Sequence, residues 1–581
     1  MIAALTSIAS ALFVCAACYC TGRIVTPGRP FPWPVRMVLG MAVLSCIFFF
    51  LLESGLGYPP AFILVGVAAI GGFAAVIGPR VGPRQISFPV PVLVMLGVYA
   101  VLYGMHALAP ETGYDATGYH LGLPMEWLRN GGFPNRIGFY ELLPQGMETI
   151  YGFALSLNAD SVAPALVHFA CLFATVALLL SVGKKLELPT WAAPCTSVVF
   201  VACPSVGVSA TSAYTDIAFV LATLVTFYLV LDLWPDSSPA SWALAGVAAG
   251  FCYSVKLPGL VVPAAIIIVL LIKRRLPELA GFAAGAFMIA APWMGRALFS
   301  TWNPVAPMLN TVFRNIWFSP ETDSYLRGVF QFLSPNGLRE FSVLDDIAFH
   351  GSRLGLIGPI VIAAPLGLLG LWKKSVRPIA LASCILFVIY TQNLSARFLL
   401  PSFLFAVLAL MAVVPRKLAH TLTIVAAIAS WPAVASVYSG SGVALDGWPY
   451  QAALGMESQQ SYLRRTMPIY EFAEFARKHI PRDARVFDCA GLPSYYSGAV
   501  TQQFWQTSEM WSLYRILLDA MPQKARDRVG LQFASHDVRY LTLAAGPSAG
   551  VPWAADFMKE PEAWGFRLVG SVGDYRLYAV R

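Results

Sequence analysis

Long apolar runs separated by short polar loops make up most of this chain. A helix needs about 20 predominantly apolar residues to cross a bilayer, and about fourteen stretches before residue 440 fit this requirement. The pattern therefore predicts an α-helical polytopic membrane protein. Two of these stretches meet at Lys256, where one long re-entrant segment is the alternative to two spans.

After residue 440 the pattern changes to short, polar-rich segments with alternating apolar positions. The predicted elements are an amphipathic helix at 467–480, strands at 484–489 and 538–545, and a hairpin at 566–580 that turns near Gly573 and Asp574. These elements predict a small α/β domain behind the helical bundle.

Three regions follow from this division. Residues 1–87 are expected to form extra N-terminal transmembrane helices, 88–439 the main membrane domain, and 440–581 the α/β domain. Clusters of Lys and Arg fall in alternate short loops, which marks the cytoplasmic side. The loops 107–160 and 297–353 and the C-terminal domain are therefore predicted on the outer face.

The composition agrees with a membrane protein. Hydrophobic residues make up 57% of the chain and charged residues only 12%, against about 25% charged in soluble domains. The formal net charge is +8, but the basic residues lie in short clusters between apolar runs. This arrangement favours contact with the lipid bilayer over binding of nucleic acid.

Candidate chemistry gathers in residues 111–148, a polar stretch between two apolar runs. Acids at a membrane face often mark functional sites, and aromatic rings beside carboxylates suit sugars. Asp115 is the candidate catalytic residue; the candidate substrate-binding residues around it are Tyr114, Tyr119, His120 and Glu141. The alternatives are solvated loop acids and a histidine packed within the loop.

Further candidates are charged residues inside or beside apolar runs. The cations that could bind a phosphate are Lys256, Arg296, Arg353 and Arg397. Arg397 could instead snorkel to the interface. Asp216 is a candidate for binding substrate, although Thr215 and Asp216 could simply cap the helix that follows.

Five segments, in this order, resemble the GT-C superfamily of membrane glycosyltransferases, most of all its ArnT-like and protein-mannosyltransferase-like branches. They are YDATGYHLGLP (114–124), SAYTDIAF (212–219), KLPGLVVP (256–263), APWMGRALFSTWNPVAP (291–307) and SARFLLP (395–401). The resemblance covers roughly residues 88–440. It departs from the family at Phe398, where Tyr is common, and in the extra helices that precede residue 88.

The resemblance implies an inverting glycosyltransferase that uses a polyprenyl-phosphate-linked sugar. Asp115 would be the general base on the acceptor, and cations would stabilise the departing phosphate. The expected acceptor is a glycan, glycolipid or protein in cell-envelope synthesis, on the periplasmic face of a bacterial inner membrane. No cofactor or metal site is predicted; a divalent cation between Asp115 and Glu141 is the open alternative.

Two other functions fit a polytopic chain. A transporter or flippase for a lipid-linked precursor should carry internal repeats and polar residues at mid-span. A ligase or polymerase of surface polysaccharide should rely on Arg and His in its large outer loop. The acid early in the first large loop, and the charges gathered toward one face, favour the glycosyltransferase.

Overall fold

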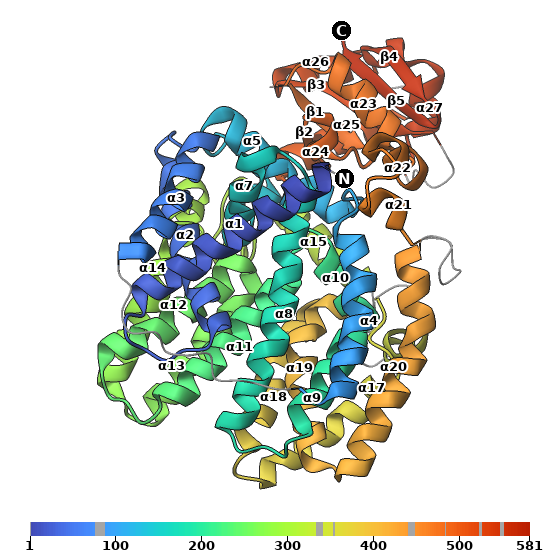
Figure 1. The fold of residues 1–581 in the computed structure, drawn as a ribbon. Helices are drawn as coiled ribbons and strands as arrows, with labels where there is room; N and C mark the ends of the chain where they lie inside the picture. Colours follow the sequence, from blue (N-terminus) through green and yellow to red (C-terminus); the bar gives the residue numbers. More distant parts are fainter. Residues whose placement is uncertain are drawn as a thin grey trace. The chain divides into compact units, whose positions relative to one another are not determined.

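The computed structural model describes most of the chain, and its ribbon is drawn in Figure 1. The described residues are 2–75, 88–332, 341–351, 355–439, 448–482, 484–521, 526–545 and 551–581. They form two compact units. We call Met1–Glu111, Pro144–Pro292 and Val329–Glu457 the helical unit, and Thr112–Leu143, Trp293–Gly328 and Ser458–Arg581 the sheet unit.

The first half of the helical unit is a succession of apolar helices. Their bounds are α1 (Ile2–Val25), α2 (Trp33–Glu53), α3 (Pro59–Ala75), α4 (Val90–Ala107), α7 (Gly146–Asn158), α8 (Val162–Lys185), α9 (Ala192–Ala202), α10 (Pro204–Thr211), α11 (Asp216–Leu233), α12 (Pro239–Val255), α13 (Val261–Ile272) and α14 (Leu276–Thr301), whose end enters the sheet unit.

The second half contains shorter elements and two long final helices. Their bounds are α16 (Phe341–Asp345), α17 (Ile360–Ala363), the 3-10 helix Ala364–Trp372, α18 (Arg377–Gln392), α19 (Ala396–Val413), α20 (Arg416–Ser439) and α21 (Tyr450–Ala453). Proline opens several helices of this unit, including α2, α4 and α12, where its missing N–H leaves no hydrogen bond unmade.

Seven helices of the described chain are long and apolar enough to cross a membrane, or eight if the bent pair α9 and α10 is one span. The seven are Ala4–Val25, Trp33–Glu53, Val90–Ala107, Val162–Lys185, Asp216–Leu233, Leu276–Thr301 and Ala396–Val413. The chain is therefore a polytopic helical membrane protein, as predicted. The predicted count of fourteen spans is not confirmed.

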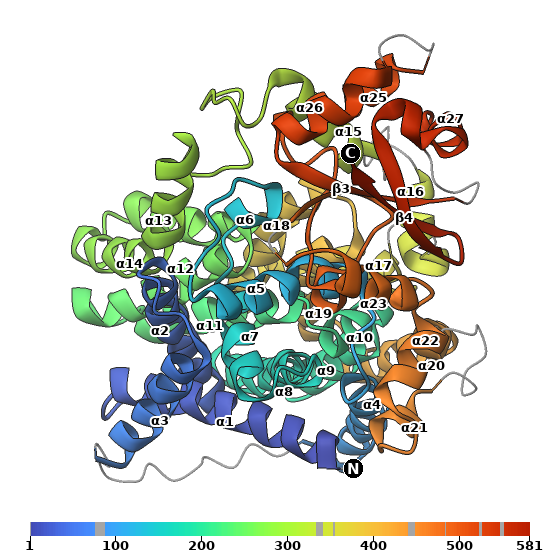
Figure 2. The same cartoon turned by 90° about the horizontal axis from the view of Figure 1, so that it is seen from above.

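Helices α1 and α2 run side by side in both ribbon views (Figures 1 and 2). A Cβ atom added to Gly40 of α2 would collide with the carbonyl oxygen of Cys18, and one on Gly22 of α1 would collide with that of Arg36. Glycine at these two crossing points lets the backbones approach closely, as small residues do between membrane helices.

The sheet unit contains a five-stranded sheet of order β2-β1-β3-β5-β4. Its strands are β1 (Arg485–Cys489), β2 (Val500–Gln502), β3 (Val538–Ala544), β4 (Phe566–Val572) and β5 (Tyr575–Val580). Strands β2 and β3 pair with β1 in parallel, whereas β5 pairs antiparallel with β3 and β4. The carboxyl ends of β1, β2 and β3 therefore share one edge of the sheet.

Helices cover both faces of this sheet, and Figure 2 shows strands β3 and β4 among them. The helices of the unit are α5 (Gly122–Asn130), α6 (Phe139–Leu142), α15 (Pro320–Phe332), α22 (Gln459–Thr466), α23 (Tyr470–His479), α24 (Ser494–Ser497), α25 (Ser508–Asp519), α26 (Val529–Ser535) and α27 (Ala554–Lys559). Phe487 joins a core with α25, α26 and α27, and its neighbour Val486 joins another with α23. This alternation is the two-residue period of a strand.

The predicted C-terminal elements are confirmed in type. The helix predicted at 467–480 is α23, the strands predicted at 484–489 and 538–545 are β1 and β3, and the predicted hairpin is β4 and β5. Strand β2 was not predicted. It contains only Val500–Gln502, which is too short to show an alternating pattern.

Candidate functional site

A cluster of charged side chains lies at the ends of three elements of the helical unit. Asp216 is the first residue of α11 and is only 3% exposed. Its Oδ1 atom forms an ion pair with Lys256 Nζ, and its Oδ2 atom lies 3.8 Å from Arg397 Nη1. Two cations therefore meet one buried carboxylate.

A break in the helical path places Lys256 in this cluster. The residue is extended (φ −157°, ψ 128°) between α12 and the short 3-10 helix Leu257–Leu260. Neither α12 nor α13 is among the helices long and apolar enough to cross a membrane, so the choice between two spans and one re-entrant segment stays a prediction. Lys256 Nζ lies 3.9 Å from the ring centroid of Phe398, and Arg397 stacks over Tyr214 at 4.7 Å. These cation–π contacts add to the ion pairs in holding the two cations.

Two buried side chains that the sequence did not single out fix the turn before α11. His168 Nε2 accepts hydrogen bonds from the backbone N–H groups of Ile217 (3.1 Å) and Ala218 (3.2 Å), so its Nδ1 donates to Ser212 O (2.8 Å). Glu111 Oε2 accepts from the N–H of Ala213 at 2.7 Å. Together they satisfy donors at the helix start, a task that Thr215 does not perform with its side chain.

The sheet unit holds a second charged cluster, in residues 112–143. Arg136 makes a two-pronged ion pair with Glu126, and its Nε donates to Glu141 Oε1 at 2.8 Å. Both carboxylates are more than nine-tenths buried. Burial disfavours the charge on Arg136, but Glu141 and Glu126 outweigh that penalty and raise its pKa.

A pocket opens beside this second cluster. Residues 112–143 contribute Tyr114, Gly118, Tyr119, Gly122, Leu123, Glu126, Arg129, Arg136, Tyr140 and Glu141. The C-terminal part contributes Asp488, Leu492, Ser494, Ala499, Val500, Thr501, Gln503 and Gln506. Asp488 and Leu492 lie at or just after the carboxyl end of β1, and Gln503 follows that of β2, the edge where parallel sheets usually bind ligands.

Asp488 shapes the rim of the pocket at the end of β1. Its carboxylate accepts hydrogen bonds from the backbone N–H groups of Ala490, Gly491 and Leu492 and from Thr542 Oγ1. Gly491 has φ +76°, the left-handed conformation that glycine adopts without strain. Burial raises the pKa of Asp488, and the hydrogen bonds oppose that shift only in part.

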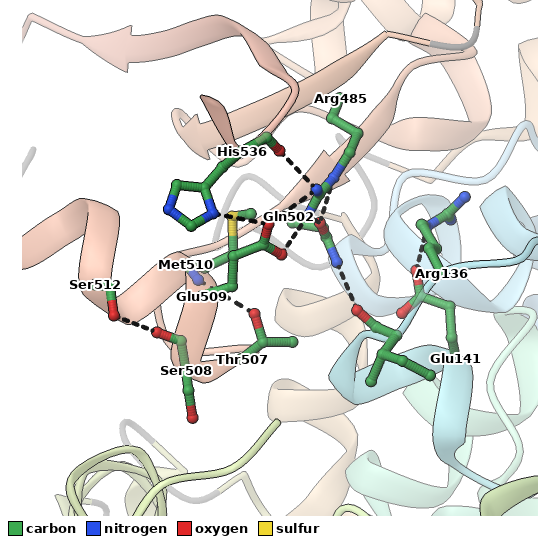
Figure 3. A network of polar contacts seen from close by, with 11 residues as sticks. Arg136, Glu141, Arg485, Gln502, Thr507, Ser508, Glu509, Met510, Ser512 and His536 are labelled. Carbon is green, nitrogen blue, oxygen red and sulfur yellow. Dashed lines mark hydrogen bonds and ion pairs between the residues drawn. The ribbon is translucent and has the colours of Figure 1, made fainter. Parts of the chain in front are cut away.

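A polar network ties residues 112–143 to the sheet (Figure 3). Gln502 on β2 donates to Ile137 O at 3.2 Å, and its Oε1 atom accepts from Arg485 of β1 at 2.7 Å. Arg485 in turn pairs with Glu509 at 2.8 Å, and Glu509 contacts His536 Nδ1 at 3.3 Å. The pocket walls are therefore held together by neighbouring strands and the helix α25.

The predicted site residues fall into two groups. Asp216, Lys256 and Arg397 converge in the helical unit, whereas Tyr114, Tyr119 and Glu141 line the pocket of the sheet unit. His120 is buried and packs against Tyr119, with ring centroids 4.0 Å apart.

Three other predicted residues stand apart from these groups. Asp115 is half-buried just before the π-helical turn Ala116–His120, and it is not among the described residues that line the pocket. Arg296 lies against Phe133, with its guanidinium 4.2 Å from the ring centroid, and contacts Pro134 O at 3.5 Å. Arg353 lies outside the described residues.

Within the part of the chain that the structure describes, no group of three or more His, Cys, Asp or Glu side chains could hold a metal ion. The expectation of a metal-free, cofactor-free site stays a prediction, because no measurement tests it. The same is true of the roles predicted for the individual residues.

One part of this chain matches a known protein family. Residues 149–295 match the family model of dolichyl-phosphate-mannose-protein mannosyltransferases. The predicted resemblance to GT-C membrane glycosyltransferases is confirmed over this stretch, which contains Asp216 and Lys256. No curated protein sequence matches the chain.

Two solved structures of ArnT from Cupriavidus metallidurans are similar to this chain. The structure bound to undecaprenyl phosphate is 14% identical and has a TM-score of 0.47, with 84% of this chain and 97% of that chain covered. The apo structure is 15% identical and has a TM-score of 0.48, with the same coverage.

Proposed function

We propose that this chain is an inverting glycosyltransferase that moves a sugar from a polyprenyl-phosphate donor to an acceptor on the outer face of a bacterial inner membrane. The observation that carries this proposal is that Lys256 and Arg397 both pair with Asp216. Of these residues, Asp216 and Lys256 lie in the stretch that matches the mannosyltransferase family. The acceptor would be a glycan, glycolipid or protein of the cell envelope.

The reaction breaks the bond between the anomeric carbon of the sugar and a phosphate oxygen. The departing polyprenyl phosphate is weakly basic, so it needs stabilisation of its negative charge and no general acid. Lys256 and Arg397 are suited to this task because both are held at one carboxylate and against aromatic rings. Asp216 would orient the two cations.

The acceptor needs a base because its hydroxyl or amine proton must leave as the new glycosidic bond forms. We assign this proton to Asp115, a half-buried acid at the start of the π-helical turn Ala116–His120. Attack opposite the leaving phosphate inverts the anomeric carbon, so one catalytic carboxylate suffices. The distribution of basic residues supports an extracytoplasmic position for residues 112–143 and the C-terminal domain, which is part of this proposal.

The test is transfer by the purified full-length chain in lipid vesicles. Vesicles would contain polyprenyl phosphates carrying labelled hexoses, aminosugars or pentoses, together with envelope glycolipids and glycans as acceptors. We expect label to move to an acceptor from one donor class, with free polyprenyl phosphate released in equal amount and the anomeric configuration inverted. Vesicles without protein are the control. Retention of configuration, or absence of transfer from every donor, would refute the proposal.

A further inference from the structure

The pocket of the sheet unit has a chemistry that the proposed reaction does not use. We propose that it binds a sugar ring of the acceptor, and that this sugar is uncharged or carries an amine rather than an acid. The acceptor role rests on the proposed function, whereas the binding of a sugar rests on the pocket alone. Three features of the pocket support this: an aromatic wall, a wall of neutral polar groups and the balance of charge.

The aromatic wall comes from residues 112–143. Tyr119 and Tyr140 stack with ring centroids 4.0 Å apart and an interplanar angle of 10°, and Trp505 packs its edge against Tyr140 at 5.7 Å. Both tyrosines are only half-buried, so parts of their rings remain exposed to the pocket. Apolar faces of this kind, with a few placed polar groups, are typical of sites for small molecules.

The opposite wall carries groups that both donate and accept hydrogen bonds. Ser494 and Thr501 hold their hydroxyl oxygens 2.7 Å apart, and each hydroxyl has further hydrogen-bonding capacity. Gln503 donates to the hydroxyl of Tyr114 and accepts from Trp505 Nε1 at 2.7 Å, which fixes the direction of its amide. Sugar hydroxyls are donors and acceptors at once, so a neutral wall of this kind matches them.

The charges around the pocket disfavour an anionic ligand. Three carboxylates line it, Glu126, Glu141 and Asp488, against the guanidinium groups of Arg129 and Arg136. Arg136 is held by both glutamates in short ion pairs. A uronate or phosphate would therefore meet an excess of acids, while an ammonium group would meet complementary charge.

The two walls are fastened to each other, which makes the pocket a built feature of this unit. Gln502 donates to Ile137 O at 3.2 Å, and Arg129 donates to Gly498 O at 3.3 Å. A Cβ atom on Gly122 would come within 2.9 Å of Ser494 Cβ, so the walls approach closely at this point as well. Preformed walls lower the entropy lost when a ligand is ordered.

The experiment measures binding without requiring transfer. Saturation-transfer NMR on the full-length chain in detergent micelles would titrate methyl glucosaminide, methyl mannoside and methyl glucuronide. The variants are Gln503→Leu, which removes the fixed amide, and Thr501→Val, which removes one hydroxyl at nearly constant shape. Gln532→Ala, an exposed glutamine of α26 outside the pocket, is the matched control.

We expect saturable binding of the amine-bearing or neutral sugar and at least tenfold weaker binding of the glucuronide. Gln503→Leu should weaken binding about tenfold and Thr501→Val several-fold, because each removes a hydrogen bond to the ligand, while Gln532→Ala should have no effect. Absence of binding by all three sugars, equal binding in Thr501→Val, or preference for the glucuronide would overturn the inference. Binding with this pattern in a chain that transfers no sugar would keep the sugar site and overturn its assignment to an acceptor.

Discussion

The helical unit and the sheet unit each bury a small cluster of charges, in opposite proportions. In the helical unit two cations, Lys256 and Arg397, share the single carboxylate of Asp216. In the sheet unit one cation, Arg136, is shared by Glu126 and Glu141. The first arrangement is suited to receive an anion, and the second holds a loop in place and repels one.

The two clusters also differ in how they are built. Asp216, Lys256 and Arg397 stand at helix starts and at a break between helices, where the backbone leaves its regular path. The Arg136 cluster is built within one continuous stretch, Thr112–Leu143. Gln502 of β2 binds this stretch through a hydrogen bond to the carbonyl oxygen of Ile137. We therefore expect changes in the first cluster to affect transfer and changes in the second to affect stability.

Replacing Arg136 should lower the stability of the protein more than any other change proposed here. Arg136→Met would leave Glu126 and Glu141 buried without their cation, which should destabilise the sheet unit by about 3–5 kcal/mol. Denaturant unfolding of the full-length chain, followed by the fluorescence of the buried Trp553 and Trp564, would measure this loss. Adding Glu126→Gln and Glu141→Gln to the variant should restore part of the stability. A stability equal to that of the wild type would show that the cluster does not hold the loop.

Lys256 tests the expectation that changes in the charged cluster of the helical unit affect sugar transfer. Lys256→Met should lower the rate of sugar transfer by about 10²–10³-fold, the usual cost of removing one charge-stabilising group from a transition state. The exposed Lys374→Met, in a loop of the same unit, is the matched control and should transfer at the wild-type rate. Equal transfer rates in both variants would remove Lys256 from the donor site.

His168 should have an intermediate effect, through the position of Asp216. His168→Phe would leave the N–H groups of Ile217 and Ala218 without their acceptor, at a cost of about 1–3 kcal/mol in stability. His168→Gln, whose side-chain oxygen can accept these bonds, should recover part of that loss and part of the transfer rate. Unfolding and transfer measured on the same preparations would check this; no difference between the two variants would contradict it.

The smallest effect concerns pH and Asp488. Burial raises the pKa of this carboxyl in the folded chain above its unfolded value of about 4. The contribution of Asp488 to the free energy of unfolding is therefore complete below a pH of about 4, and it is lost as the pH rises through the raised pKa. Compared with Asp488→Asn, the wild type should lose stability as the pH rises above about 4. A pH-independent difference between the two would refute the raised pKa.

Sequence patterns predicted the elements better than the contacts between them. Strands β1 and β3 and the terminal hairpin were predictable because each contains enough alternating residues to show the period of a strand. Asp216, Lys256 and Arg397 were each recognisable as charges within apolar runs. Their convergence was not predictable, because residues up to 181 positions apart meet only through helix packing.

The pocket was predictable on one side only. Tyr114, Tyr119 and Glu141 stood out in the polar stretch 111–148, but Arg136 was overlooked, although it lies between Glu126 and Glu141 in the sequence. Asp488 was overlooked although its strand β1 was predicted, and Gln503 was overlooked because β2, which it follows, is too short to recognise. Without β2, the sequence provides no sign that two strand ends share one edge with the outer loop.

We propose that this chain transfers a sugar with Asp115 as the general base. The most direct measurement compares the initial rate of labelled-sugar transfer by the wild type with that of Asp115→Asn, in vesicles with donor and acceptor. Asp527→Asn, an exposed acid in the same unit, is the control for lost charge. We expect Asp115→Asn to transfer 10²–10⁴-fold more slowly, on the order of a lost general base, and the control to match the wild type. Wild-type transfer by a folded Asp115→Asn variant would contradict the claim.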